Sequence, residues 1–102
     1  MTSGILTALQ KAKEHYAKEG FEIVGVFGSA ARDEMTPQSD IDILYDLRKN
    51  FIETYRGFAA FSRLNAIRSE LRSLLGVEVD LAARSGLSRT AQKYILRDLQ
   101  RV

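Results

Sequence analysis

The chain has 102 residues, with 15 lysines and arginines against 13 aspartates and glutamates, so its formal net charge is +2 and its pI is near 9.1. This length predicts a single domain over residues 1–102 with one core, and so mild an excess of positive charge does not argue for a nucleic-acid partner. The chain has no cysteine, no signal peptide and no apolar run long enough to cross a membrane, which excludes disulfides and thiolate metal sites and leads us to expect a cytoplasmic protein without a membrane partner.

The first predicted element is an amphipathic helix over about residues 3–19. Its apolar side chains recur at helical spacing on one face: Ile5, Leu9, Ala12 and Tyr16. Gly20 follows this face and is a suitable terminator. The one histidine, His15, lies on the polar or boundary side of the helix, so a surface position is favoured over a catalytic one.

Two short strands are predicted next, as a hairpin-like pair. Residues 22–27 have the pattern of a short buried strand, and residues 40–45 are rich in β-formers. The polar loop over residues 30–39 joins them, with the chain's only proline, Pro37, where a turn is expected. On the second strand, three alternating side chains should face the core: Ile41, Ile43 and Tyr45.

A long helix, a third strand and a last helix complete the pattern. The long helix is predicted over about residues 52–75, with Gly76 at its end and an apolar face formed by Tyr55, Phe58, Phe61, Leu64, Leu71 and Leu75. We interpret Phe58, Phe61 and Leu64 as core or partner surface. This helix is long enough for the crossover that joins parallel strands, so residues 76–82 are expected to pair in parallel with the second strand. Ser88 suits the N-cap of a last helix that carries Ala91, Ile95 and Leu99. The order predicts an α/β fold, a small mixed β-sheet with flanking helices.

Asp40 and Asp42 are the most informative pair in the sequence. Side chains two apart on a strand point to the same face, so the two carboxylates should converge. Without a cation they would repel, and one would take up a proton or cost stability. Mg²⁺ is commonly held by one or two carboxylates, water and substrate phosphates. A lone Asp-x-Asp is more often a solvated strand face or a helix cap. The residues around it favour a site for Mg²⁺ and a nucleoside triphosphate.

Ten residues separate a Gly-Ser pair from Asp40. Gly28 ends the first strand and can adopt a positive φ, which lets a ligand approach the backbone closely. The N–H groups of such a turn and the Ser29 hydroxyl can hold phosphate oxygens. A Gly-Ser pair alone is more often a plain turn, but Gly-Ser-x10-Asp-x-Asp should arise by chance in roughly one sequence of this length in a thousand. Arg32, nearby, could pair with the triphosphate or be solvated.

A third carboxylate is expected from the third strand. Alternation directs Val77, Val79 and Leu81 inward and Glu78 and Asp80 to the other face. If this strand lies beside the Asp40 strand, one of the two acids joins the pair. A two-metal site needs a ligand that also touches the incoming nucleophile. Asp80 is the predicted third acid, and Glu78 is the second choice.

The sequence closely resembles the minimal nucleotidyltransferase (MNT) family of the DNA polymerase beta superfamily. Residues 28–32, 36–44 and 79–81 carry the resemblance, which covers nearly the whole chain. It departs from the family pattern at Asp33 and Tyr45, outside the catalytic set. The resemblance implies a polymerase-beta-like nucleotidyltransferase fold.

The same resemblance implies roles for the candidate residues. Gly28 and Ser29 would contact the triphosphate, and Arg32 and Ser39 are further candidates for nucleotide binding. The remaining residues would hold two Mg²⁺ ions and act as the catalytic acids: Asp40, Asp42 and Asp80.

Many members of the family act as antitoxins beside a HEPN-domain ribonuclease toxin, which they neutralise by transferring AMP to a tyrosine hydroxyl. The resemblance therefore implies ATP as substrate and a HEPN-domain toxin as both partner and acceptor, in a complex with this chain. A domain this small cannot enclose a large acceptor, which favours a macromolecule over a small metabolite. Two alternatives stay open: a non-catalytic subunit that masks a partner, and a transferase acting on a small molecule, which normally needs an extra domain.

Overall fold

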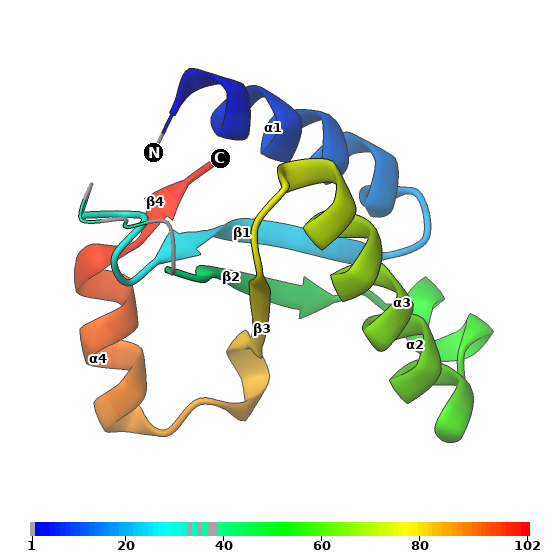
Figure 1. Ribbon diagram of the computed structural model, residues 1–102. Coiled ribbons are helices and arrows are strands. Elements are labelled where there is room, and N and C mark those ends of the chain that lie inside the picture. The colour runs from blue at the N-terminus through cyan, green and yellow to red at the C-terminus, as the bar shows by residue number, and fades with distance from the viewer. Residues whose placement is uncertain (1, 33, 35, 37–38) are drawn as a thin grey trace.

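The computed structural model describes residues 2–32, 34, 36 and 39–102. It is an α/β fold with a four-stranded mixed sheet and flanking helices, as predicted (Figure 1). The elements in chain order are α1 (Ser3–Ala17), β1 (Phe21–Phe27), β2 (Ile41–Leu47), α2 (Lys49–Thr54), α3 (Phe58–Leu75), β3 (Val79–Ala83), the 3-10 turn η1 (Arg84–Gly86), α4 (Arg89–Asp98) and β4 (Gln100–Arg101). Pro37, with its predicted turn, and Asp33 lie outside the described residues. No described helix is both long and apolar enough to span a bilayer.

The strands lie in the order β3-β2-β1-β4. β1 and β2 are antiparallel, with Phe27 opposite Asp42, which confirms the hairpin-like pair. β2 and β3 are parallel, with Asp42 opposite Asp80, which confirms the predicted crossover through the long helical segment. Because β3 has a neighbour on only one side, it forms one edge of the sheet.

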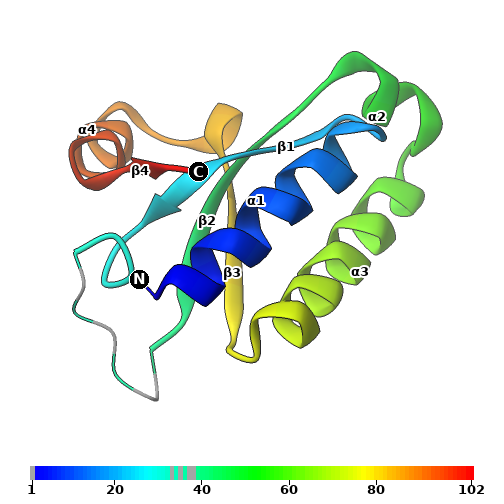
Figure 2. The same cartoon turned by 90° about the horizontal axis from the view of Figure 1, so that it is seen from above.

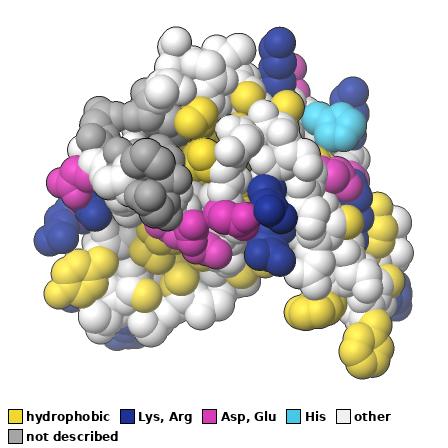
Figure 3. Space-filling view, in the orientation of Figure 1, with side chains coloured by type: hydrophobic (Ala, Val, Ile, Leu, Met, Phe, Trp, Pro, Cys, Tyr) yellow, Lys and Arg dark blue, Asp and Glu magenta, His cyan; other side chains and the backbone are white. Residues whose placement is uncertain are grey.

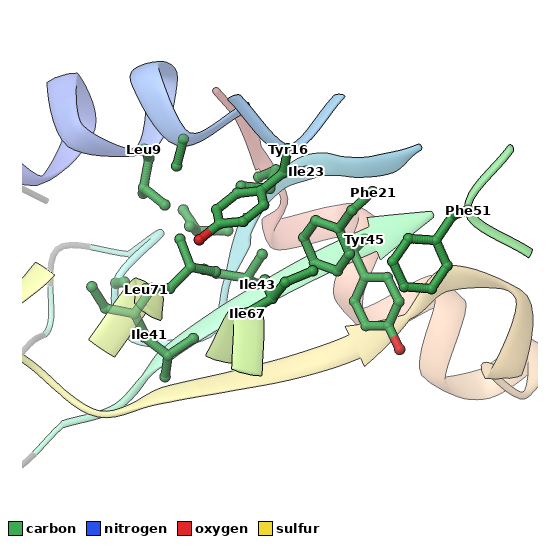
Figure 4. Close-up of a cluster of buried hydrophobic side chains, with 14 residues drawn as sticks. Leu9, Tyr16, Phe21, Ile23, Ile41, Ile43, Tyr45, Phe51, Ile67 and Leu71 are labelled. Atoms are coloured by element: carbon green, nitrogen blue, oxygen red, sulfur yellow. The ribbon is translucent and has the colours of Figure 1, made fainter. Parts of the chain in front are cut away.

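One face of the sheet is covered by α1 and α3, which lie side by side above it in both views (Figures 1 and 2). The predicted inward residues of β2 are all buried there, and the predicted face of α1 packs on them, with Leu9, Ala12 and Tyr16 buried and Ile5 partly buried. Figure 4 shows Leu9 and Tyr16 of α1 beside Ile41, Ile43 and Tyr45 of β2 in the buried cluster. The rings of Phe21 and Tyr45 stack with their centroids 4.9 Å apart.

A charged cluster ties α1 to α3 at the rim of this core. The Tyr16 hydroxyl donates to Glu70 at 2.6 Å, and Arg63 donates to Glu19 at 2.6 and 2.8 Å and to Glu70 at 3.0 Å. The hydrogen bond from Arg63 lowers the pKa of Glu19, while burial and the hydrogen bond to Glu70 raise the pKa of Tyr16. Each of these polar groups therefore has a partner in the folded chain.

The prediction of one continuous helix over residues 52–75 is wrong. The segment forms two helices, α2 and α3, which are separated at residues 55–57, and Gly57 takes a φ of 58° that a helix interior does not allow. The break turns the start of α3 outward, so Phe58 is 90% exposed and Phe61 is 66% exposed. These two residues are therefore surface rather than core, whereas Leu71, further along α3, is buried.

The C-terminal segment adds a short strand that the sequence pattern did not predict. Ser88 caps α4 by accepting a hydrogen bond from the Ala91 N–H at 3.1 Å, as expected. The two residues of β4 then pair with β1 opposite Gly25 and Val26. A Cβ on Gly25 would overlap the Gln100 carbonyl oxygen, so the glycine permits this close pairing.

Candidate active site

The structure brings three carboxylates together on the sheet face that α1 and α3 leave open. Asp42 lies in β2 directly opposite Asp80 in β3, and Asp40 immediately precedes β2. Asp42 is half-buried, whereas Asp40 and Asp80 are exposed. In the space-filling view, acidic side chains form a row across the middle of one face, next to basic side chains (Figure 3). Parallel register thus unites acids that are about forty residues apart in the chain.

The three carboxylates perturb one another. Burial is the main cause that raises the pKa of Asp42, and the charges of Asp80 and Asp40 add to it. The pKa of Asp80 is also raised, first by desolvation and then by its hydrogen bond with Asp40. Arg32 opposes the shift at Asp42, and Arg68 opposes the shift at Asp80, but neither reverses it. The site therefore holds negative charge that the protein's own cations do not fully compensate.

A turn after β1 abuts Asp42. Gly28 has a φ of +73°, and a Cβ at this position would lie 2.5 Å from Asp42 Oδ2. Both the backbone conformation and the space therefore require glycine. Ser29, the next residue, is half-buried, and its carbonyl accepts from the Glu34 N–H at 2.9 Å. The Gly-Ser turn and the acids are thus neighbours in space, on adjacent strands.

Two other predicted nucleotide-binding residues make contacts within the protein. Arg32 forms ion pairs with Glu34 and with Asp98 of α4, both at 3.1 Å. The Ser39 hydroxyl accepts from the Thr36 N–H at 2.9 Å and forms a local turn next to Asp40. Arg32 stays close enough to the acids to influence Asp42. The roles of both residues toward a nucleotide stay predictions.

Glu78, the second choice for the third acid, lies one residue before β3. Its carboxylate forms an ion pair with Arg72 of α3 at 2.7 Å, and both side chains are more than half exposed. Asp80, by contrast, is in register with Asp42 and interacts with Asp40. The geometry therefore favours Asp80 over Glu78 as the third member of the cluster.

The carboxylates suit a hard cation that arrives with its own ligands. Within residues 2–32, 34, 36 and 39–102, no three His, Cys, Asp or Glu side chains are close enough to hold a metal ion by themselves. Mg²⁺ usually takes only one or two carboxylates and completes its shell with water and phosphate oxygens. The donor set and its excess negative charge fit a metal that binds together with a phosphate ligand.

A cavity that the sequence did not suggest lies along α3 and the edge strand β3. Its volume is about 330 Å³, and it is lined by Asp80 and Leu81 of β3, by Tyr45, and by four residues of α3: Phe61, Leu64, Asn65 and Arg68. No local pattern links these α3 residues to the acids, because only the crossover of the chain brings them to the same edge.

A small mixed sheet that brings three acids together from two neighbouring strands, with a glycine turn against one of them, is the arrangement expected of a nucleotidyltransferase. The match to the family described as nucleotidyltransferase domain spans residues 8–101. The chain belongs to this family and is an enzyme of the minimal type.

Known proteins with similar sequences align with nearly the whole chain. The protein adenylyltransferase MntA of Thermococcus cleftensis is 34% identical, over 93% of this chain and 86% of the relative. A Methanocaldococcus jannaschii protein, named provisionally as a protein adenylyltransferase, is 31% identical over 95% and 93% of the two chains. A solved structure described provisionally as a minimal nucleotidyltransferase has a TM-score of 0.69 and 28% identity, covering 96% and 95% of the two chains. The resemblance stated from the motifs is thereby confirmed.

Proposed function

We propose that this chain transfers AMP from ATP, with Mg²⁺, to a tyrosine hydroxyl of a HEPN-type ribonuclease toxin and so acts as its antitoxin in the cytoplasm. The observation that carries the proposal is the register of the sheet. It aligns Asp42 with Asp80 on one side and sets the Gly28 turn against Asp42 on the other. A triphosphate and an acceptor can therefore meet at Asp42 from opposite sides.

The triphosphate side is the turn after β1. The backbone at Gly28 and the Ser29 hydroxyl would bind phosphate oxygens, and Asp40 and Asp42 would hold Mg²⁺. Asp80 would join them as a third ligand when the bound ion draws the carboxylates closer together. When bound, two such ions supply charge neutralisation for the attacking and leaving oxygens. The excess negative charge of the acids supports this role, since a divalent cation relieves their repulsion.

The acceptor side is Asp80. Its carboxylate would accept the proton of the attacking hydroxyl, whose oxygen forms a bond to the α-phosphorus. The bond between the α-phosphorus and the oxygen that bridges to the β-phosphorus breaks, and pyrophosphate leaves with the electron pair. The chain's contribution is mainly to position the two reactants and to stabilise the charge that develops.

A protein acceptor is supported by the names of the relatives, which are protein adenylyltransferases. The exposed Phe58 and Phe61 also favour contact with a macromolecule. The same exposure would suit a non-catalytic subunit that masks its partner, which is the competing function.

Intact-mass spectrometry separates the two functions. A HEPN-type toxin incubated with the chain, ATP and Mg²⁺ should gain the mass of one or more AMP groups, located on tyrosine by peptide sequencing, and should lose ribonuclease activity. Asp42→Asn should bind the toxin without modifying or silencing it. If the toxin is silenced while its mass is unchanged, masking is the function and the transfer proposal is wrong.

A further inference from the structure

We propose that the cavity between α3 and β3 is the acceptor pocket, which takes an aromatic hydroxyl side chain of a partner protein and presents its oxygen to Asp80. This inference rests on the proposed function and adds the place where the acceptor binds. It assigns Phe61, Asn65 and Arg68 to acceptor recognition.

The order of the strands fixes the side from which an acceptor arrives. The Gly28 turn follows β1, on one side of Asp42, whereas Asp80 lies on β3, on the other side. A triphosphate bound at the turn therefore occupies the β1 side. β3 is an edge strand, and the cavity beside it is lined in part by Asp80, so a second reactant can approach Asp80 from the side away from β1.

The lining of the cavity matches a phenol side chain. Its apolar walls come from Phe61, Leu64 and Leu81, and its polar groups include Asp80, Asn65 and Arg68. A volume of about 330 Å³ is at the lower end of small-ligand sites, which suits one aromatic ring better than a whole nucleotide. An aliphatic hydroxyl such as that of serine would leave the apolar walls unfilled.

Arg68 adds a charge preference. It lies close enough to Asp80 for its charge to act on that carboxylate, and it takes part in none of the ion pairs that the described residues form with one another. An exposed guanidinium beside the pocket can pair with a carboxylate that flanks the incoming hydroxyl side chain. The partner segment is therefore expected to carry a carboxylate next to its aromatic residue, on the side that meets Arg68 and not the three aspartates.

Phe61 connects the pocket to a surface that a protein could cover. The same ring borders a second, apolar hollow with Gly57 and Phe58 at the exposed start of α3. Hydrophobic side chains protrude at this end of the molecule, on the face that also carries the acidic row (Figure 3). A protein that inserted one side chain beside Asp80 would bury Phe58 and Phe61 in the same contact, whereas a small molecule would leave them exposed.

Peptide binding measured without nucleotide tests the pocket itself. A fluorescein-labelled peptide with one tyrosine between glutamates should bind the wild type in EDTA, and Phe61→Ala and Arg68→Ala should each weaken binding at least tenfold. Both residues are exposed, so the variants should keep their melting temperatures. Leu74→Ala and Arg89→Ala, exposed residues away from the pocket, are the matched controls and should bind normally. A version with lysines in place of glutamates should bind more weakly, and this difference should vanish in Arg68→Ala.

The outcomes separate this inference from the proposed function. The pocket would be refuted, and the proposed function would stand, if two results came together. The wild type would transfer label from ATP to the toxin, and Phe61→Ala and Arg68→Ala would leave both peptide binding and the KM for the toxin unchanged. Competition between ATP with Mg²⁺ and the peptide would overturn the pocket too, because the cavity would then be part of the nucleotide site. Peptide binding without transfer to any protein would instead refute the function and leave only a binding pocket.

Discussion

The two faces of the sheet differ in how their charged side chains are paired. On the helix-covered face, Arg63 sits between Glu19 and Glu70, and every charge of the cluster has an opposite partner. On the open face, three carboxylates crowd together, and the nearby arginines leave two of them with raised pKa values. Folding explains the first arrangement but gains nothing from the second. A cluster that costs stability in the isolated chain indicates binding of a cation and its ligand.

Removing one acid of the open face should largely abolish catalysis without unfolding the protein. Asp42→Asn should lower AMP transfer on the order of a thousandfold, because it removes a charge that the metal needs. The melting temperature should stay the same or rise, since the substitution relieves repulsion with Asp80 and Asp40. Radiolabel transfer and a thermal melt measure the two effects. Wild-type turnover with Mg²⁺ would contradict the assignment of Asp42.

Comparing two acids of one segment sharpens the assignment of Asp80. Asp80→Asn should slow transfer roughly a hundredfold, the size of a lost general base, and leave triphosphate binding nearly intact. Glu78→Gln should have little effect, because it only loosens an exposed ion pair with Arg72. Measuring binding and transfer separately for each variant decides the matter. A silent Asp80 with a severe Glu78 phenotype would reverse the roles.

Substituting two glycines in parallel, Gly28 and Gly76, distinguishes the effect of backbone strain on stability from an effect on triphosphate binding. Gly28→Ala and Gly76→Ala both place alanine at a φ of +73°, so each should lose about 1–2 kcal/mol of stability. Only at position 28 would the new Cβ press on Asp42; at Gly76 it meets nothing within 4 Å. Gly28→Ala should therefore lose triphosphate binding, and Gly76→Ala should keep it. Calorimetric titration with ATP and Mg²⁺, beside denaturant unfolding, provides both readings; equal binding losses would contradict a special role for Gly28.

The balanced cluster on the other face should affect stability alone. Arg63→Ala should cost about 1–2 kcal/mol, because Glu19 and Glu70 lose their charged donor, and transfer should be unchanged. The pKa of Glu19 is lowered in the folded chain, so its contribution is present above its ordinary value of 4.5 and is lost as the pH falls through the folded value. Unfolding measured from pH 7 downward should show a shallower acid loss in Arg63→Ala than in the wild type. Parallel curves would exclude this cluster as the cause.

Local patterns predicted most of the fold. The alternation in β2 and β3 and the periodicity of α1 depend on residues next to one another, and the hairpin-like and parallel pairings followed from loop and crossover lengths. The break before α3 was missed because the apolar spacing continues across Gly57, although its positive φ ends the helix. β4 was missed because a strand of two residues is too short to show an alternating pattern of apolar side chains. The need for glycine at position 25 is visible only in the structure, where the Gln100 carbonyl lies against it.

In the candidate site, too, some residues could be predicted from the sequence and others could not. Gly28, Asp40 and Asp42 belong to a fixed spacing and could be singled out from the sequence, and the parallel register then favoured Asp80 over Glu78. Arg68 could not be singled out, because its nearness to Asp80 depends on where the crossover places α3. The ion pair between Arg32 and Asp98 likewise joins residues far apart in the chain. Contacts between elements that carry no shared spacing are visible only in three dimensions.

Calorimetric titration of ATP with and without Mg²⁺ tests most directly whether the acidic cluster binds a metal and a triphosphate together. The wild type should bind ATP when Mg²⁺ is present and should not bind ATP in EDTA. It should bind Mg²⁺ alone only much more weakly, because the carboxylates need phosphate oxygens to complete the metal's coordination shell. Asp42→Asn should abolish the Mg²⁺-dependent heat. Equally tight binding of ATP in EDTA, or an unchanged titration of Asp42→Asn, would contradict the account.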